Sequence, residues 1–514
     1  NRLMGTSDYH LSQLERLIRR DRNHPSVILW SLGNEEWRIE GSAVGARIAA
    51  RMQQFARGID STRLYSAAIS GGWGGISTVV DAAGVNYIRQ GDTDRQHAAY
   101  PWQVIIGTEE TTTQATRGVY IEDAESAHLP PQEDGSSGGN VEVGWKHYAA
   151  RPYAAGVFFW TGFDYRGEPT PYGWPGIASQ FGILDLAGFP KDSYYYLKSW
   201  WTQEPVLHVF PHWNWNGREG ESIDVRVYSN FDSVELFQDG RSLGRKDMPR
   251  NGHLSWDVVY RAGTLRAVGY DAGTPAAETV VATTGSPAAV ELAVDRTVLS
   301  ADGRDIAVVA VRIVDSDGRI VPTADNDIVF NVSGNGRIIG VGNGDPSSHE
   351  PDRFFEQVAS RPIGEWSAPN PADDKTPVVW EADFDKPDLG EGSVLLLNAL
   401  GREQTVTLNG VVLQDKVAAD RAHTEIPIEA LTLRPTGNRL KIAALPFREW
   451  RNRENIREVH PASWRIVTSA GEWHRRVFNG LAQVLVQSAH GAGTVLIEAK
   501  TSGLRSASIR IDVE

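Results

Sequence analysis

Two short apolar runs, each ending in a pair of glutamates, constrain the fold of this chain more than any other feature of its sequence. The first lies within residues 21–37 (DRNHPSVILWSLGNEEW) and reaches Glu35, and the second lies within 103–110 (QVIIGTEE) and reaches Glu109. Runs that are apolar on both faces are typical of strands buried in parallel sheets. In barrels of alternating strands and helices, functional side chains lie at the carboxyl ends of the strands. The sequence therefore predicts two buried strands that bring two carboxylates to one rim.

Strand-like and helix-like segments alternate through residues 7–160. Amphipathic helices are expected at 7–20, 42–58 and 143–151, and strands are expected at 27–32, 64–69, 82–87, 104–109 and 156–160. This alternation is typical of a parallel α/β fold. Five strands are fewer than the eight that close a (β/α)8 TIM barrel. We therefore expect a partial barrel over 1–206, with exposed sheet edges and an open, apolar lumen.

The sequence pattern changes near residue 207, where alternating strands with Gly and Asp turns replace the strand–helix alternation. This pattern predicts an immunoglobulin-like β-sandwich at 207–285 and a second one formed by 286–350 together with 475–514. The residues between those two pieces, 351–474, predict an inserted β-sandwich. The expected fold class is therefore multidomain, with a partial TIM barrel followed by all-β domains.

Composition excludes several classes of protein. The net charge of −14 argues against nucleic-acid binding, which depends on basic surfaces. The absence of cysteine excludes disulfides and thiolate metal sites, and no apolar stretch is long enough to predict a membrane span. The sequence does not decide the compartment, although a periplasmic or extracellular location is slightly favoured over a cytoplasmic one. It also leaves a homo-oligomer open.

Three segments, in this order along the chain, resemble glycoside hydrolase family 2. Residues 21–35 resemble its acid/base signature, 103–110 resemble its nucleophile strand, and 156–201 resemble the last barrel strand and following loop of its bacterial beta-galactosidases. In this family the acid/base glutamate ends the fourth barrel strand, so the resemblance implies that the chain carries strands 4–8. It also implies a partner, an N-terminal fragment of the same enzyme carrying strands 1–3, and a galactoside or oligosaccharide as substrate.

The resemblance assigns a role to one glutamate of each pair. The acid/base follows Gly-Asn directly in the family, which is Glu35 here, and the nucleophile closes the IIGTE run, which is Glu109. Retaining glycosidases hold two such carboxyl groups about 5–5.5 Å apart. Side-chain alternation gives weak support, because it places Glu109 on the same strand face as Gly107. Glu36 and Glu110 are expected to support the site or to form ion pairs.

Four further residues are expected to contact the substrate. Asn34 matches the family's asparagine whose amide bonds the sugar 2-hydroxyl, with a backbone cap as the alternative role. Tyr87 matches a tyrosine that touches the nucleophile, where a phenol donor would hold Glu109 ionised; a packing role is its alternative. Trp160 would form a wall against the apolar face of the sugar. Asp164 would receive sugar hydroxyls.

The inserted region resembles the jelly-roll-like sugar-binding β-sandwich of the family, on the strands and turns of SVLLLNALGREQTVTLNGVVLQ and IPIEALTLRPTGNRLKIAAL. Its tryptophans are predicted either as a sugar platform or as core residues, with the core favoured. They are Trp366, Trp380, Trp450 and Trp464.

The favoured function is a retaining exo-acting β-galactosidase. A β-glucuronidase or another family 2 exo-β-glycosidase is the first alternative, but the Asn-x-Lys motif of the family's glucuronidases is not seen beyond the nucleophile. The alternative from another class is a non-catalytic carbohydrate-binding protein. No cofactor is expected with certainty, because the upstream ligands of the family's magnesium site cannot be carried over to this chain. Asp345, His349 and Glu350 are interpreted as a polar loop rather than a metal site.

Overall fold

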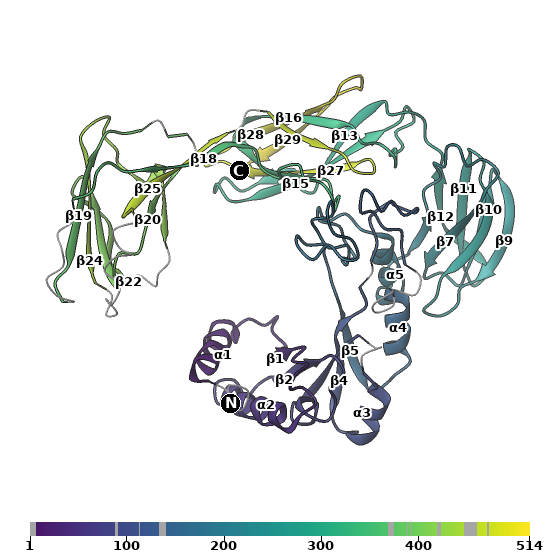
Figure 1. The fold of residues 1–514 in the computed structure, drawn as a ribbon. Coiled ribbons are helices and arrows are strands. Elements are labelled where there is room, and N and C mark those ends of the chain that lie inside the picture. Colours follow the sequence, from purple (N-terminus) through teal and green to yellow (C-terminus); the bar gives the residue numbers. More distant parts are fainter. Residues whose placement is uncertain are drawn as a thin grey trace.

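The computed structural model describes residues 7–87, 91–112, 114–132, 140–367, 375–387, 389–390, 392–418, 423–446, 460–469 and 472–514. Its first part is one parallel sheet whose strands lie in chain order (Figure 1). The strands are β1 (Leu29–Asn34), β2 (Leu64–Ile69), β3 (Ala82–Asn86), β4 (Val104–Glu110) and β5 (Ala154–Phe159). In register, Trp30 lies opposite Tyr65, and Ala83 lies opposite Ile105. The five parallel strands match the partial barrel expected from the sequence.

Helices follow the strands, as in a β/α fold. They are α1 (Asp8–Asp21), α2 (Ala43–Arg57), α3 (Thr93–Ala99), α4 (Val141–Ala149) and α5 (Asp192–Trp201), with a 3₁₀ turn, η1 (Ile76–Thr78). In α1, Ser7 caps the start by accepting a hydrogen bond from His10 N (3.2 Å), and Leu11, Leu14 and Ile18 form its buried face. The sequence did not predict α3, because its buried residues are polar and form no apolar stripe. None of the described helices is both long enough and apolar enough to cross a membrane.

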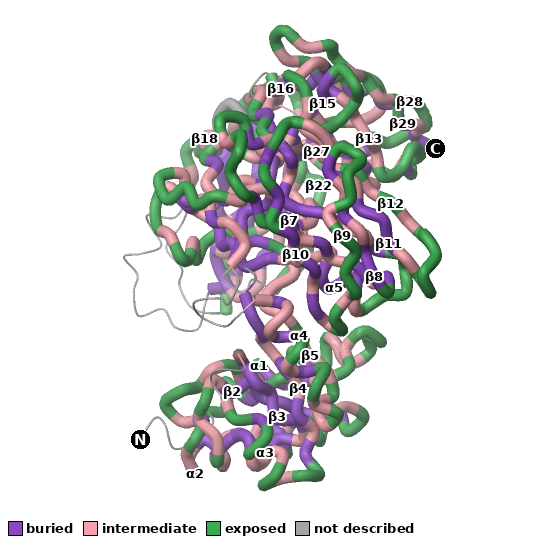
Figure 2. Tube along the Cα trace, turned by 90° about the vertical axis from the view of Figure 1, so that its right-hand side faces the viewer, coloured by how far each residue is buried: buried purple, intermediate pink, exposed green. Residues whose placement is uncertain are grey.

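The outer strands of the sheet, β1 and β5, each pair on one side only within the described part of the chain. The central strand β3 is buried along its whole length, and Figure 2 shows this buried centre between more exposed borders. Apolar side chains at the borders are open to solvent: Ile28 is 71% exposed and Phe158 is 50% exposed. A closed barrel has no free edges. The sheet therefore has the exposed edges that the strand count predicts.

Residues 207–282 form a β-sandwich beside α5 (Figure 1). One sheet has the order β10-β7-β6 and the other has the order β12-β11-β8-β9. The strands are β6 (Leu207–Phe210), β7 (Ser222–Ser229), β8 (Ser233–Gln238), β9 (Arg241–Asp247), β10 (Leu254–Val259), β11 (Thr264–Asp271) and β12 (Thr274–Ala282). Alternate residues of both sheets point inward and share one apolar core, which includes Trp213, Val225 and Leu236.

A second sandwich is built from two separated pieces of the chain. Its sheets have the orders β13-β15-β27-β17 and β14-β29-β28-β16-β26. The strands are β13 (Ala289–Val294), β14 (Val298–Leu299), β15 (Ile306–Val314), β16 (Asp327–Gly334), β17 (Gly336–Gly342), β26 (Trp473–Arg476), β27 (Leu481–Ser488), β28 (Gly493–Lys500) and β29 (Ala507–Val513). Because β27 pairs with both β15 and β17, the chain leaves this domain after β17 and returns to complete its core.

The segment between these pieces forms two further four-stranded sheets, β18-β25-β20-β23 and β19-β24-β21-β22. Their elements are β18 (Phe355–Pro362), β19 (Val378–Phe384), β20 (Val394–Leu397), β21 (Glu403–Leu408), β22 (Val411–Ala418), β23 (Thr424–Pro427), η2 (Ile428–Ala430), β24 (Asn438–Leu445) and β25 (Ala462–Ser469). Trp380 and Trp464 are buried in the core of this sandwich, and Trp366 packs against it. Trp450 lies outside the described residues. Two of the described tryptophans, Trp380 and Trp464, are thus core residues.

A buried arginine ties the barrel part to the second sandwich. Arg117, in the loop after β4, forms an ion pair with Asp185 (2.5 Å) and donates to Asn343 O (3.0 Å) and Phe478 O (2.8 Å). Hydrogen bonds to charged groups are the stronger class, and a buried cation needs such partners. With the hydrogen bonds from Asn479 Nδ2 to Arg117 O (2.8 Å) and between His128 and Asp345 (2.9 Å), this side chain holds the loop after β4 against a domain more than two hundred residues away in sequence.

Candidate active site

The side chains of Glu35 and Glu109 meet at the amide group of Asn86. Asn86 ends β3, and its Nδ2 donates to Glu35 Oε1 (3.1 Å) and to Glu109 Oε2 (3.1 Å). The two carboxylate oxygens therefore lie no further apart than twice that distance. The same Nδ2 donates to Asn34 Oδ1 (2.8 Å), and Asn86 Oδ1 accepts from the Thr108 hydroxyl (2.8 Å). The structure thus brings both predicted glutamates, and Asn34 with them, to one rim of the sheet.

An unusual backbone conformation directs these side chains into the rim. Glu35 and Tyr87 each follow the last residue of a strand, and their φ angles are 54° and 57°. Such left-handed values are uncommon for residues with a Cβ. Here they are held by hydrogen bonds from Glu35 N to Ala68 O (3.1 Å) and from Tyr87 N to Glu109 O (2.9 Å). A non-glycine residue in this region costs free energy and persists only where surrounding contacts hold it. Such residues are found mainly at functional sites.

A β-bulge decides which glutamate of the second pair faces the rim. The register of β3 against β4 shifts at Thr108, so that side-chain alternation breaks there. Gly107 faces α4, where an added Cβ would lie 2.6 Å from the Tyr148 ring, whereas Glu109 faces the rim. Glu110 is fully buried. The expectation that Gly107 and Glu109 share a face was therefore wrong, because alternation does not survive the bulge.

The surroundings of Glu109 raise its pKa. Burial raises the pKa of Glu109 above its ordinary value, and the negative charge of Glu35 adds to the increase. Hydrogen bonds from Tyr87, whose hydroxyl lies 2.7 Å from Glu109 Oε1, and from Asn34 oppose that increase. The pKa of Tyr87 is itself raised, by burial and then by this hydrogen bond. The expected tyrosine contact is present, but burial outweighs its effect on the ionisation of Glu109.

Trp160 stands beside the end of β4. It directly follows β5, and its backbone N donates to Glu110 O (2.9 Å). Its ring is half-buried and lies edge-on to the ring of Tyr165, with 5.9 Å between the centroids. Tyr165 in turn donates to Glu168 (2.5 Å), and the charge of Glu168 contributes to the raised pKa of Glu109. The loop after β5 therefore reaches the electrostatic surroundings of the carboxylates through Trp160 and its neighbours.

Comparison with known proteins identifies the family of this chain. The model described as Glycosyl hydrolases family 2, TIM barrel domain matches residues 5–115, and Glycoside hydrolase family 2 C-terminal domain 5 matches residues 290–360. A domain of unknown function matches residues 220–277. The chain is 38% identical over 406 residues to Beta-galactosidase BoGH2A from Bacteroides ovatus, covering 68% of this chain and 47% of that protein. The chain belongs to glycoside hydrolase family 2.

Two further relatives extend this comparison. A Beta-glucuronidase from Formosa agariphila is 27% identical over 351 residues, which cover 64% of this chain and 33% of that protein. The crystal structure of a beta-glycosidase from Bacteroides vulgatus has the same fold, with a TM-score of 0.67 and 24% sequence identity over 98% of this chain and 53% of that chain. The chain thus spans about half the length, or less, of the family 2 proteins that it matches.

Asp164, which was predicted to bind the substrate, does not belong to the site formed by Glu35 and Glu109. Asp164 Oδ1 accepts hydrogen bonds from Lys191 Nζ (2.8 Å) and from Gly182 N (2.8 Å), and its side chain is 1% exposed. Burial raises the pKa of Asp164 to about 6, although the Lys191 charge opposes the increase. The prediction that Asp164 receives sugar hydroxyls was wrong, because the carboxylate is enclosed. The pair instead fixes the loop after β5.

Asn86 and Thr108 are the residues of the site that the sequence analysis missed. Neither carries a charge. Asn86 lies outside the segments that resemble the family's catalytic signatures, and Thr108 lies within 103–110 but was not singled out there. The available signal was position: Asn86 immediately precedes Tyr87 at the end of a strand lying between the two glutamate-bearing strands. Carboxyl ends of neighbouring parallel strands share one edge, so an amide there is placed to contact both glutamates.

Two carboxylates that follow Glu35 in the sequence, those of Glu36 and Glu40, do not offer the ligands of a magnesium ion. Glu36 is exposed. Glu40 is buried, and its carboxylate accepts hydrogen bonds from the backbone N–H groups of Ser70 (3.2 Å) and Gly72 (2.7 Å). A magnesium site needs several convergent oxygen ligands. These two carboxylates do not provide one.

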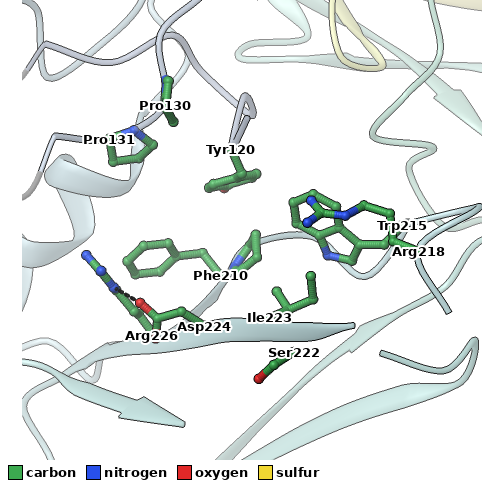
Figure 3. A pocket seen from close by; sticks show the side chains of 11 residues that line it. Tyr120, Pro130, Pro131, Phe210, Trp215, Arg218, Ser222, Ile223, Asp224 and Arg226 are labelled. Atoms are coloured by element: carbon green, nitrogen blue, oxygen red, sulfur yellow. Dashed lines mark hydrogen bonds and ion pairs between the residues drawn. The ribbon is translucent and has the colours of Figure 1, made fainter. Parts of the chain in front are cut away.

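A separate hollow of about 250 Å³ lies between the loop after β4 and the first sandwich (Figure 3). The rings of Tyr120, Phe210 and Trp215 surround it, and Asp224 pairs with Arg226 at its border (2.7 Å). Phe210 is only 4% exposed and Trp215 only 7% exposed. Sugar stacking needs an open aromatic face. The hollow therefore belongs to the packing of the two domains rather than to the carboxylate site.

Proposed function

We propose that this chain supplies both catalytic carboxylates of a retaining, exo-acting β-galactosidase. The observation that carries the proposal is the shared contact of Glu35 and Glu109 with Asn86 Nδ2, at 3.1 Å each. Twice this distance bounds the separation of the two bonded oxygen atoms, and it accommodates the roughly 5–5.5 Å between the carboxyl groups of retaining enzymes. The spacing therefore supports a reaction through a covalent glycosyl-enzyme intermediate.

In the first step of this reaction, Glu109 attacks the anomeric carbon while Glu35 gives its proton to the departing glycosidic oxygen. The bond from carbon to that oxygen breaks, and Glu109 becomes an ester of the sugar. In the second step, Glu35, now a carboxylate, takes a proton from water as the water oxygen attacks the same carbon. The ester bond breaks and Glu109 is a carboxylate again. Positive charge developing on the sugar favours the ionised form of Glu109, which burial opposes in the free site.

We propose a terminal β-galactoside as the substrate, with Asn34 bonding the 2-hydroxyl and Trp160 forming a wall of the pocket. Support comes from the beta-galactosidase of Bacteroides ovatus, which is the more similar of the two curated relatives described above. A β-glucuronidase is the second candidate, and the relative from Formosa agariphila favours it. The absence of an Asn-x-Lys motif beyond Glu109 in the sequence argues for the galactoside.

We also propose that an N-terminal segment of the same enzyme, carrying the missing barrel strands, pairs with this chain. The support is physical: β1 and β5 each have one unpaired edge in the described structure, and Ile28 and Phe158 expose apolar side chains beside them. Unpaired strand edges and exposed apolar borders are unfavourable in water and are normally covered. Further strands at these edges would close the barrel and complete the rim around the two carboxylates.

The test is hydrolysis of nitrophenyl β-galactoside and β-glucuronide by the native protein that contains this chain. Proton NMR of the first product formed reads its anomeric configuration. We expect turnover of the galactoside with release of the β-anomer. Preference for the glucuronide would replace the galactoside assignment, and release of the α-anomer would reject the retaining reaction. Sugar binding without turnover of either substrate would favour the non-catalytic alternative.

A further inference from the structure

The Asn86 amide has fewer hydrogens than it has acceptors. Within hydrogen-bonding distance of its Nδ2 are Asn34 Oδ1 (2.8 Å), Glu35 Oε1 (3.1 Å) and Glu109 Oε2 (3.1 Å). An amide N–H₂ group has two hydrogens, so it cannot serve three acceptors fully at once. Hydrogen bonds to ionised acceptors are roughly twice as strong as those to neutral ones. The two hydrogens therefore go preferentially to whichever carboxylate is ionised.

In the reaction proposed above, on which this inference rests, the two carboxylates take turns in carrying the negative charge. Glu109 begins the cycle as a carboxylate and loses its charge when it forms the ester with the sugar. In the same step Glu35 gives up its proton and becomes the carboxylate, and the second step reverses both changes. The negative charge thus moves from Glu109 to Glu35 and back, while Asn86 Nδ2 lies 3.1 Å from each of them.

We propose that Asn86 is a positioning residue that transfers its hydrogen bonds from Glu109 to Glu35 and back as the charge moves between them. The ionised carboxylate is then stabilised at every stage without movement of the chain. This requires a fixed amide, and the structure provides one. Asn86 is fully buried at the end of β3, and its Oδ1 is held by the Thr108 hydroxyl at 2.8 Å, which fixes the side on which the amide nitrogen lies.

The other groups that face the pair act on one carboxylate. Tyr87 donates to Glu109 Oε1 (2.7 Å), from the residue after β3. Glu168, from the loop after β5, raises the pKa of Glu109 by its charge. Among the hydrogen bonds of the described residues at this rim, the one donor that reaches both carboxylates is Asn86. A substitution of Asn86 should therefore affect both groups, whereas a substitution of Tyr87 should affect Glu109.

The test compares Asn86→Ala with Tyr87→Phe in the native protein, through the pH dependence of kcat/KM for a nitrophenyl glycoside. A bell-shaped profile reports the essential acid and base of the free enzyme. In Asn86→Ala we expect both limbs to move to higher pH by about one unit, and kcat to fall roughly tenfold. In Tyr87→Phe we expect only the low-pH limb to move. An Asn86→Ala profile that falls equally at every pH, or moves at one limb only, overturns the proposal.

Two controls separate this proposal from its possible confounders. Asn86→Ser keeps a small polar group at the buried position. Thermal unfolding of both variants shows whether a lower rate reflects loss of the folded structure. If the native protein hydrolyses no glycoside, the proposed function fails but the role of Asn86 is still tested. Carbon-13 NMR of labelled glutamate side chains, assigned with Glu109→Gln, then follows the titration of Glu109 directly. We expect Asn86→Ala to raise this pKa, and an unchanged titration contradicts the proposal.

Discussion

The hydroxyl of Tyr87 lies 2.7 Å from Oε1 of Glu109, and the backbone N of Tyr87 lies 2.9 Å from the carbonyl oxygen of the same residue. Tyr87 therefore holds Glu109 through both its side chain and its backbone. Tyr87 has a φ of 57° and follows the last residue of β3, which pairs with β4. Functional side chains must be held by supporting hydrogen bonds to keep a productive geometry. This double contact supports Glu109, rather than Glu110, as the group that meets the sugar.

Replacing Tyr87 by phenylalanine changes the pH dependence in a direction that follows from this contact. The phenol opposes the rise that burial causes in the pKa of Glu109, so its removal raises that pKa further. Glu109 must be ionised to attack, and activity at low pH is therefore lost first. We expect the low-pH limb of kcat/KM to rise by about one unit, measured from about pH 4 to pH 8. A limb that stays in place or moves to lower pH contradicts the assignment.

The two glutamates at the end of β4 provide a matched pair of substitutions. Glu109→Gln leaves no carboxylate to form the ester, and we expect kcat to fall roughly a thousandfold or more, with product binding retained. Glu110→Gln changes a fully buried group that lies beside α4 rather than at the rim. We expect this variant to lose stability while kcat stays within about tenfold of the wild type. Steady-state rates and titration with galactose measure both effects, and the reverse ranking of the two variants would reject the nucleophile.

Local sequence patterns located the strands well, because a strand buried on both faces leaves an apolar run that needs no distant information. The run that ends at Glu109 predicted β4 to within one residue. The strand predicted before Glu35, at 27–32, lies two residues earlier than β1 at both ends. Helix α3 left no such trace, since it buries polar residues and has no apolar stripe. The strand ends themselves were less predictable, because a bulge at Thr108 depends on how β3 and β4 pair.

Roles that depend on a distant partner could not be predicted from local patterns. Asp164 looks like a site residue in sequence because it is an acid just beyond a barrel strand, yet its partner Lys191 lies 27 positions further along. Asn86 carries no charge and so does not look like a site residue in sequence. Its role depends on contacts with residues 51 and 23 positions away. In both cases the physical role is set by tertiary contacts and burial, which the sequence alone does not reveal.

The enclosed pair of Asp164 and Lys191 predicts a pH-dependent loss of stability. Their side chains are 1% and 2% exposed. Lys191→Met leaves a buried carboxylate without its cation. Because this carboxyl can take up a proton instead, we expect the free energy of unfolding to fall by about 1–2 kcal/mol at pH 7. Urea unfolding measures this change, and the double variant Asp164→Asn with Lys191→Met should recover part of it.

The sign of the pH dependence follows from the raised pKa of Asp164, which is about 6 in the wild type compared with 3.8 for an ordinary aspartate. A folded-state pKa above the unfolded value gives stability that is fully present below the unfolded pKa and is lost as the pH rises through the folded pKa. Lys191→Met removes the charge that opposes this rise. Below about pH 6 the carboxyl is protonated in both folded proteins, so the deficit should be smallest there and should grow as the pH rises above about 6. A deficit independent of pH would show that Asp164 is not the group responsible.

Gly107 gives the last prediction, because it links the packing of α4 to the position of Glu109. A Cβ at Gly107 would lie 2.6 Å from Tyr148 Cζ and 2.8 Å from Val157 Cγ2, closer than real Cβ contacts. In Gly107→Ala either α4 or β4 must shift, and Glu109 lies only two residues further along β4. We expect kcat to fall roughly 10- to 100-fold, with about 1–3 kcal/mol lost from the free energy of unfolding. Gly173→Ala is the matched control, since a Cβ there meets nothing within 4 Å and should leave both quantities unchanged. If Gly107→Ala loses stability but keeps its kcat, the position of Glu109 does not depend on how β4 packs against α4.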